Sequence, residues 1–134
     1  MDQPAATARP LALVVEDETV IRMETADLLA DAGFEVLEAW NVVTALRQFE
    51  RRSGIDLLVT DVQMPGGRDG FALAREVAAR WPGVAIVVIS GVSAPGLRDL
   101  PSEARFIPKP FSARVVLETV QEMTRDAGGA PQIA

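Results

Sequence analysis

The sequence predicts an α/β fold, a doubly wound five-stranded parallel sheet with strand order 2-1-3-4-5. Short apolar runs alternate with amphipathic segments along most of the chain, a pattern typical of repeated β–α units. The 134 residues allow one compact domain, and the 49% that are hydrophobic provide a sizeable core. Right-handed crossovers leave 2-1-3-4-5 as the natural order for five such units. We expect the domain to occupy residues 11–126, between tails at 1–10 and 127–134.

Five segments are predicted to be strands from their short length and the pattern of their apolar residues. Leu11–Val15, Asp56–Thr60 and Val84–Ile89 predict buried strands. The last of these is apolar at every position, as a central strand covered on both faces should be. Phe34–Glu38 alternates apolar and polar residues, which indicates a half-exposed edge strand. Arg105–Ile107 is predicted to be a short final strand.

Helices are predicted between the strands from apolar residues at helical spacing. The first covers Thr19–Ala32 and is followed by Gly33, a residue suited to the left-handed end of a helix. The other three have inward-facing apolar residues at Val42, Leu46 and Phe49, at Phe71, Ala74, Ala78 and Trp81, and at Val116, Val120 and Met123. Ser112 is predicted to cap the last of these helices.

Missing residue types exclude several kinds of chemistry. The chain has no Cys and no His, so we expect no disulfide, thiolate nucleophile, Cys-based zinc site, Ser-His-Asp triad or phosphohistidine. The net charge of −6 argues against direct nucleic-acid binding, which requires clustered cations. Residues 1–10 lack the apolar stretch of a signal peptide, and the longest apolar run, Val84–Ile89, is too short to span a bilayer. We therefore expect a soluble, cytoplasmic protein.

Polar and charged residues follow four of the predicted strands. Glu16-Asp17-Glu18 come after the first, Asp61 after the third, Ser90 after the fourth and Lys109 after the fifth. In doubly wound sheets the site lies outside the carboxyl ends of the strands, so these side chains should converge. Several carboxylates at one edge repel one another unless a cation lies among them, and hard oxygen ligands suit Mg²⁺. A hydroxyl and an ammonium at the same point would complete a pocket for a phosphoryl group.

Each of these residues also has an ordinary structural explanation when it is taken alone. Asp17 and Glu18 precede a helix, where acids favour the helix dipole. Asp61 lies before a Pro-Gly turn, Ser90 stands beside a glycine, and Lys109 lies between two prolines. Their joint occurrence at four strand ends is what favours a functional site.

Four short motifs stand at these strand ends, namely Glu16-Asp17, Asp61-Val62-Gln63-Met64-Pro65, Ser90-Gly91 and Lys109-Pro110-Phe111. Through them the chain resembles the receiver domain of two-component response regulators, from Leu11 to Arg125. The resemblance implies a flavodoxin-like or CheY-like sheet and a stand-alone, single-domain signalling switch. Because no DNA-binding or enzymatic domain accompanies it in the sequence, we expect its output to pass through a partner protein.

By this resemblance Asp61 is the phosphoacceptor, which attacks the phosphorus of a phosphohistidine on a partner histidine kinase or histidine phosphotransfer protein. Mg²⁺ would be held by Asp17, Asp61 and the backbone carbonyl of Gln63, with Glu16 binding it directly or through water. The metal would neutralise developing charge and align the reacting groups. Slow autodephosphorylation is implied at the same site, so we expect a phospho-accepting signalling domain and not a metabolic enzyme.

Ser90 and Lys109 would each bind a phosphoryl oxygen. Composition supports this role for Lys109, because the 13 basic residues are 12 Arg and this single Lys, whose compact charge suits a phosphoryl oxygen. Ser90 and Phe106 are expected to form the switch that passes phosphorylation on to a downstream protein.

The chain departs from the family pattern in three places. Glu16 stands where Asp is usual, which affects Mg²⁺ affinity more than the presence of a metal site. Phe106 stands where Tyr is usual, so no phenol is available to form a hydrogen bond. The segment Val92–Glu103, where a fourth helix belongs, contains two prolines and a glycine. Its helix is therefore expected to be short, displaced or mobile.

Other functions stay open beside the phosphoacceptor. A receiver-like module that binds partners without phosphorylation is consistent with Glu16, although Asp61, Ser90 and Lys109 are all present. An Mg²⁺-dependent phosphohydrolase of the haloacid dehalogenase type would need a second Asp as general acid at the position of Gln63. An FMN binder would need a Ser/Thr/Gly-rich loop after the first strand, where acids stand instead.

Overall fold

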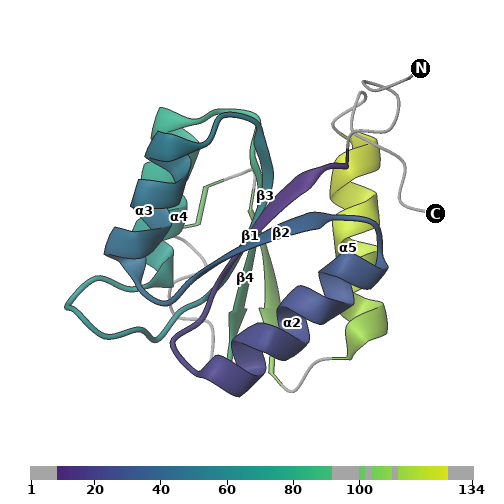
Figure 1. The fold of residues 1–134 in the computed structure, drawn as a ribbon, viewed down its shortest axis with the longest axis horizontal. Coiled ribbons are helices and arrows are strands. Elements are labelled where there is room, and N and C mark those ends of the chain that lie inside the picture. The colour runs from purple at the N-terminus through teal and green to yellow at the C-terminus, as the bar shows by residue number, and fades with distance from the viewer. Residues whose placement is uncertain (1–8, 92–99, 102–103, 110–111, 127–134) are drawn as a thin grey trace.

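A single parallel sheet organises the protein. The computed structural model describes residues 9–91, 100–101, 104–109 and 112–126. All neighbouring strands of the sheet are parallel, in the order β2-β1-β3-β4-β5. The strands are β1 (Leu11–Val15), β2 (Glu35–Ala39), β3 (Ile55–Asp61), β4 (Ala85–Ser90) and β5 (Ala104–Pro108). The predicted fold class and strand order are confirmed (Figure 1).

Helices cover both faces of this sheet (Figure 1). Within the described residues they are α2 (Thr19–Asp31), α3 (Val42–Arg51), α4 (Gly70–Arg80) and α5 (Ala113–Asp126). The apolar side chains of α3 and α4 join one core cluster with the sheet, and those of α2 and α5 join a second cluster on the opposite face. Every residue of β1 is buried, and β2 is half-exposed at the sheet edge, as their patterns predicted.

Two strands continue one residue beyond their apolar runs. β3 includes Asp61, which pairs with Ile89, and β4 includes Ser90, which pairs with Pro108. The sequence placed both polar residues just after the strands. Ladder pairing involves backbone groups and does not require an apolar side chain, so both polar side chains start from ordered strand backbone.

Capping residues define where several helices begin and end. Asn41 caps α3 by accepting from Thr44 N at 2.8 Å, and Asp69 caps α4 by accepting from Ala72 N at 2.9 Å. The Ser112 hydroxyl accepts from Val115 N at 3.2 Å, which confirms the predicted cap of α5. Gly33, with φ 105°, ends α2 in the left-handed conformation that was predicted for it.

Some predictions fall outside the described residues. The expected tails lie almost wholly in residues 1–8 and 127–134, and most of Val92–Glu103 lies in 92–99 and 102–103. The domain limits and the order of the fourth helix therefore stay predictions. Among the helices that the structure does describe, none combines the length and apolar character needed to cross a bilayer.

Candidate functional site

The carboxyl ends of four strands bring the predicted site residues to one edge of the sheet. Glu16 directly follows β1, Asp61 ends β3, Ser90 ends β4 and Lys109 directly follows β5. Because all the strands are parallel, these ends lie side by side. The backbone links two of them, since Lys109 N–H donates to the Ser90 carbonyl at 2.8 Å. The site therefore combines residues that are far apart in the sequence.

Three carboxylates meet at this edge. Glu16, Asp17 and Asp61 each offer an oxygen, and these oxygens all lie within 4.8 Å of one another. Glu16 is 5% exposed and the Asp61 side chain 12% exposed, whereas Asp17 lies open to solvent. A partly buried set of hard oxygen donors with one open side is chemically suited to Mg²⁺. The residues present therefore fit the predicted metal.

Glu16 shows the electrostatic cost of this arrangement. Its pKa is raised from 4.5 to about 7, first because burial disfavours the charged form. The Glu18 N–H, which donates to Glu16 Oε2 at 2.9 Å, opposes this rise, as does Lys109, while the neighbouring acids Asp61 and Asp17 add to it. Near neutral pH a proton and a cation therefore compete for the Glu16 carboxylate.

The two carboxylate oxygens of Asp61 have different surroundings. Oδ1 accepts the Val62 N–H at 2.8 Å, which fixes the orientation of the carboxylate. Oδ2 lies 3.5 Å from Lys109 Nζ, the ammonium of a side chain that is 29% exposed. Oδ2 thus faces the cation, whereas Oδ1 is held by the backbone.

The backbone of Asp61 is held as firmly as its side chain. The buried Thr60 hydroxyl donates to the Asp61 carbonyl at 2.8 Å, and Gly70 N–H donates to the Val62 carbonyl at 2.8 Å. A Cβ at position 70 would lie 2.0 Å from the Asp61 carbonyl oxygen, so the start of α4 can approach this closely only with glycine there. Sequence reasoning missed Gly70. A glycine directly after the capping Asp69, at the first position of a helix, was the available signal.

The remaining predicted residues lie around the same edge. Ser90 is buried, and Gln63 lies two residues beyond Asp61 with its side chain exposed. Phe106 is half-buried and packs against the core cluster on the α3/α4 face. The carbonyl of Gln63 as a metal ligand and the switch role of Ser90 and Phe106 stay predictions.

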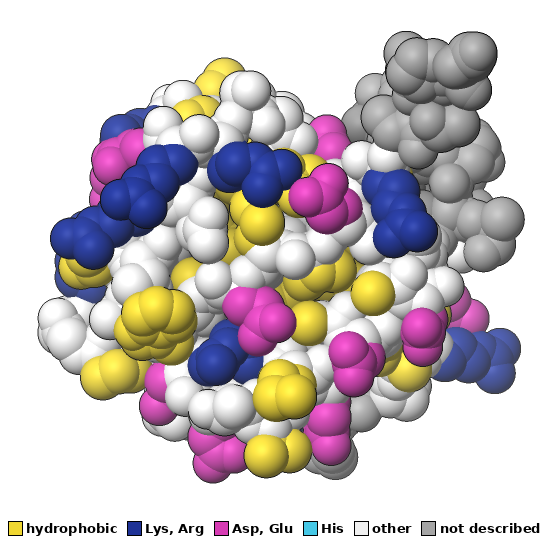
Figure 2. All heavy atoms as spheres, viewed as in Figure 1, with side chains coloured by type: hydrophobic (Ala, Val, Ile, Leu, Met, Phe, Trp, Pro, Cys, Tyr) yellow, Lys and Arg dark blue, Asp and Glu magenta, His cyan; other side chains and the backbone are white. Residues whose placement is uncertain are grey.

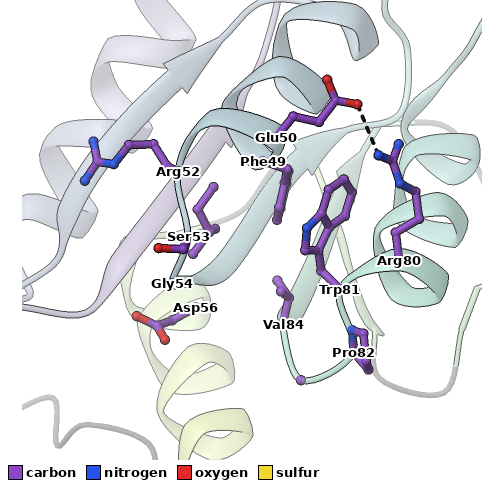
Figure 3. A pocket seen from close by; sticks show the side chains of 12 residues that line it. Phe49, Glu50, Arg52, Ser53, Gly54, Asp56, Arg80, Trp81, Pro82 and Val84 are labelled. Carbon is purple, nitrogen blue, oxygen red and sulfur yellow. Dashed lines mark hydrogen bonds and ion pairs between the residues drawn. The ribbon is translucent and has the colours of Figure 1, made fainter.

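A larger hollow lies at the opposite end of the sheet, where α3 and α4 end and β3 begins (Figure 3). Its volume is about 630 Å³. Trp81 on its wall packs against Phe49, with ring centroids 4.9 Å apart, and beneath the guanidinium of Arg80 at 4.3 Å. Arg80 is already paired with Glu50 at 3.1 Å. The charged and aromatic side chains of this wall thus contact one another. The acidic edge therefore remains the candidate functional site.

Comparison with models of protein families identifies the family of this chain. The model of the response regulator receiver domain matches residues 12–121. The chain belongs to this family. Glu16, Asp17, Asp61 and Lys109 all lie within the matched segment, and the resemblance predicted from the strand-end motifs is confirmed.

Several relatives of this receiver domain are named as sensor kinases or response regulators. It is 39% identical over 115 residues to the sensor kinase CckA of Brucella abortus, covering 83% of this chain and 12% of CckA. It is 31% identical to the response regulator receiver protein CpdR of the same organism, covering 83% of this chain and 93% of CpdR. The chain spans between 12% and 58% of the length of the first four curated relatives it matches.

Solved receiver structures share the fold. The response regulator TrrA of Thermotoga maritima, crystallised in complex with Mg²⁺ and BeF, is 29% identical, with a TM-score of 0.75. The match covers 85% of this chain and 98% of TrrA. The receiver domain thus has the architecture of a two-component signalling protein.

Proposed function

We propose that this receiver domain accepts a phosphoryl group on Asp61 and changes its partner binding in response. The observation that carries the proposal is the environment of Asp61, whose Oδ2 lies 3.5 Å from Lys109 Nζ and whose carboxylate lies beside those of Glu16 and Asp17. A carboxylate with one oxygen fixed by the backbone and the other facing a cation is positioned as a nucleophile.

The proposed reaction moves one phosphoryl group from nitrogen to oxygen. A carboxylate oxygen of Asp61 attacks the phosphorus of a phosphohistidine, and a new P–O bond gives a mixed carboxylic–phosphoric anhydride. The P–N bond breaks, and its electron pair stays on the imidazole of the donor, which takes up a proton from solvent. Later attack of water on the phosphorus returns the aspartate and releases phosphate, which is the slow autodephosphorylation.

The acidic edge fits Mg²⁺, and we assign its ligands to Asp17, Asp61 and the backbone carbonyl of Gln63. Glu16 contributes directly or through a water molecule. When bound, the metal supplies positive charge that offsets the negative charge on the phosphoryl oxygens. The raised pKa of Glu16 supports the assignment, because a buried carboxylate among other acids is stabilised by a cation.

Lys109 and Ser90 bind the incoming phosphoryl oxygens in this proposal. The Lys109 ammonium already faces Asp61, and its backbone N–H is fixed to the Ser90 carbonyl. Movement of the Ser90 hydroxyl toward the phosphoryl group then affects Phe106. Ser90 on β4 pairs with Pro108 on β5, and Phe106 lies two positions before Pro108 on the same strand. This is the route by which phosphorylation reaches a downstream protein.

The partners follow from this chemistry. A histidine kinase or a histidine phosphotransfer protein supplies the phosphoryl group in the cytoplasm, and a downstream protein reads the phosphorylated state. Receiver chemistry is contained in residues 11–126, with tails on either side. The relationship to CpdR and to CckA supports a two-component setting.

The test is phosphorylation by a small acyl phosphate with and without Mg²⁺, followed by intact mass and peptide mapping. The wild-type chain should gain one phosphoryl group on the peptide containing Asp61, and only with Mg²⁺. Asp61→Asn should gain none. Asp69→Asn is the matched control, because it makes the same change in the same loop while Asn keeps the cap of α4.

Labelling of Asp61→Asn at wild-type level would show that the acceptor is another residue. A wild-type chain that takes up no phosphoryl group in Mg²⁺ would favour the module that binds partners without phosphorylation. Steady release of phosphate at enzymatic turnover from monoesters would favour a phosphohydrolase.

A further inference from the structure

The negative charge of the protein is concentrated in one stretch of the chain. Outside the acids assigned to the metal site, residues 18–46 hold six of the 19 acidic residues but only one of the 13 basic residues, Arg22. This stretch contains α2, β2 and the first half of α3. The rest of the chain is close to neutral, although the whole carries −6. A local field of this size attracts cationic partners to one side of the molecule.

The same stretch exposes most of the large apolar side chains that face solvent. Five such residues occur among the described ones, and four of them, 52–63% exposed, are Val20, Met23, Trp40 and Val43. We call these four the α2–α3 surface. The fifth, Val115, lies on α5. Exposed Trp and Met are typical of binding surfaces and unusual on a bare surface.

The arrangement of the elements brings the two halves of the α2–α3 surface together. α2 packs beside β2, and β2 leads directly into α3. Arg22 Nε on α2 pairs with Glu38 Oε1 on β2 at 3.0 Å. Val20 and Met23 flank Arg22 in the sequence, and Trp40 follows Glu38 by two residues. The Arg22 side chain is 15% exposed and its charge is matched by Glu38. Arg52, which lies beyond the stretch, pairs with Glu35 at 3.3 Å, so arginines offset two of these acids, Glu38 and Glu35, and the stretch contains no second basic residue to offset the others.

The space-filling view shows the same pattern. Hydrophobic side chains are interleaved with Asp and Glu over the lower half of this face, the region of α2 and of the start of α3 (Figure 2). Most of the Lys and Arg side chains on this face lie across its upper part (Figure 2). The α2–α3 surface, which is apolar and bordered by acids, is therefore complementary to a partner surface that is apolar and bordered by Lys and Arg.

We propose that the α2–α3 surface binds an amphipathic helix of a partner protein whose apolar face is flanked by Lys and Arg. The apolar side chains supply the contact area, as in other helix-binding surfaces, and the acids supply attraction and orientation. A symmetric dimer of this chain would place two copies of the same acidic surface against each other, which is unfavourable. This binding involves neither Asp61 nor a phosphoryl group, so it is independent of the phosphoacceptor function.

The experiment uses a fluorescent peptide of about 18 residues, long enough for a stable amphipathic helix when bound. It contains only Leu and Lys, with Leu at helical spacing on one face. One control peptide has Glu in place of every Lys, and a second has the same Leu and Lys in scrambled order. Fluorescence anisotropy with the full chain should show binding of the patterned Leu/Lys peptide about tenfold or more tighter than either control, weakening as salt is added.

Matched variants locate the binding. Val20→Thr combined with Val43→Thr should weaken binding of the patterned peptide about fivefold or more, because both side chains lose apolar contact area. Val115→Thr makes the same change at the exposed valine of α5 and should leave binding unchanged. Circular dichroism of each variant confirms that the fold is retained.

Three results would overturn the proposal. Equal binding of the scrambled peptide would show unspecific charge attraction. Equal weakening by Val115→Thr would place the contact elsewhere. Sedimentation that shows a dimer of the wild type, dissociated by the Val20→Thr and Val43→Thr pair, would assign the surface to a second copy of this chain.

Discussion

Gly70→Ala tests how closely the start of α4 approaches the proposed phosphoacceptor. The added Cβ would lie 2.0 Å from the Asp61 carbonyl oxygen and 2.9 Å from the Val62 Cα. Ordinary contacts between such atoms are about 3.5 Å or more, so the two segments must separate by more than 1 Å. The three nearest atoms, Asp61 O, Asp61 C and Val62 Cα, all belong to the backbone. No side chain can rotate to relieve the contact.

Two opposing effects set the magnitude. Overpacking of this kind costs roughly 1–3 kcal/mol and occasionally more, and separation also weakens the hydrogen bond from Gly70 N to the Val62 carbonyl, worth about 1 kcal/mol. Alanine recovers at most about 1 kcal/mol through its higher helix propensity. We expect Gly70→Ala to lower the free energy of unfolding by about 2–3 kcal/mol.

Urea denaturation followed by far-ultraviolet circular dichroism measures this change, with Gly91→Ala as the control. A Cβ at position 91 would meet Lys109 side-chain carbons at 3.7 and 3.8 Å, which are ordinary contacts, so that variant should stay within about 0.5 kcal/mol of wild type. Acyl phosphate should also label Gly70→Ala more slowly, because the displaced carbonyl belongs to Asp61. A Gly70→Ala variant as stable as Gly91→Ala would refute the reasoning.

Four further predictions concern the charged groups of the site. In metal-free buffer, Glu16→Gln should become more stable than wild type as pH rises from about 4.5 to about 7, by about 3 kcal/mol at the upper end. The reason is that burial raises the pKa of Glu16 to about 7, so its ionised form destabilises the folded state. Urea titrations across this pH range measure the difference in the free energy of unfolding, and a difference that does not change with pH would contradict the prediction. Asp61→Asn should unfold at the same or higher urea concentration, since it removes one of three crowded carboxylates; a clear loss of stability would mean that its ion pair with Lys109 outweighs the repulsion. Lys109→Arg should slow labelling by acyl phosphate, because the planar guanidinium cannot replace a compact ammonium; wild-type labelling would reduce Lys109 to a surface cation. Mg²⁺ should bind at roughly millimolar concentrations and more weakly at lower pH, as calorimetry can measure; tight binding that Asp17→Ala leaves unchanged would place the metal elsewhere.

The sequence by itself determined the order of the elements and which residues stand at the strand ends. Val84–Ile89 is apolar at every position and corresponds to the buried β4, and the alternating Phe34–Glu38 corresponds to the edge strand β2. Each strand lies one residue further along the chain than predicted. These predictions succeed because periodicity records which side of an element is buried. The family motifs then singled out Asp61 and Lys109 from the sequence alone.

The tertiary structure alone decided the surroundings of those residues. In the sequence, Glu16 is one acid in an acidic run. Its burial, and with it the raised pKa, follows from the elements packed around it. Likewise Gly70 stands nine positions after Asp61, yet α4 begins against the Asp61 carbonyl. Hydrophobic periodicity predicts which side of a helix or strand is buried, but not which residues pack against it. Burial of a given side chain, electrostatic repulsion and close backbone approach depend on how the crossovers place distant elements together.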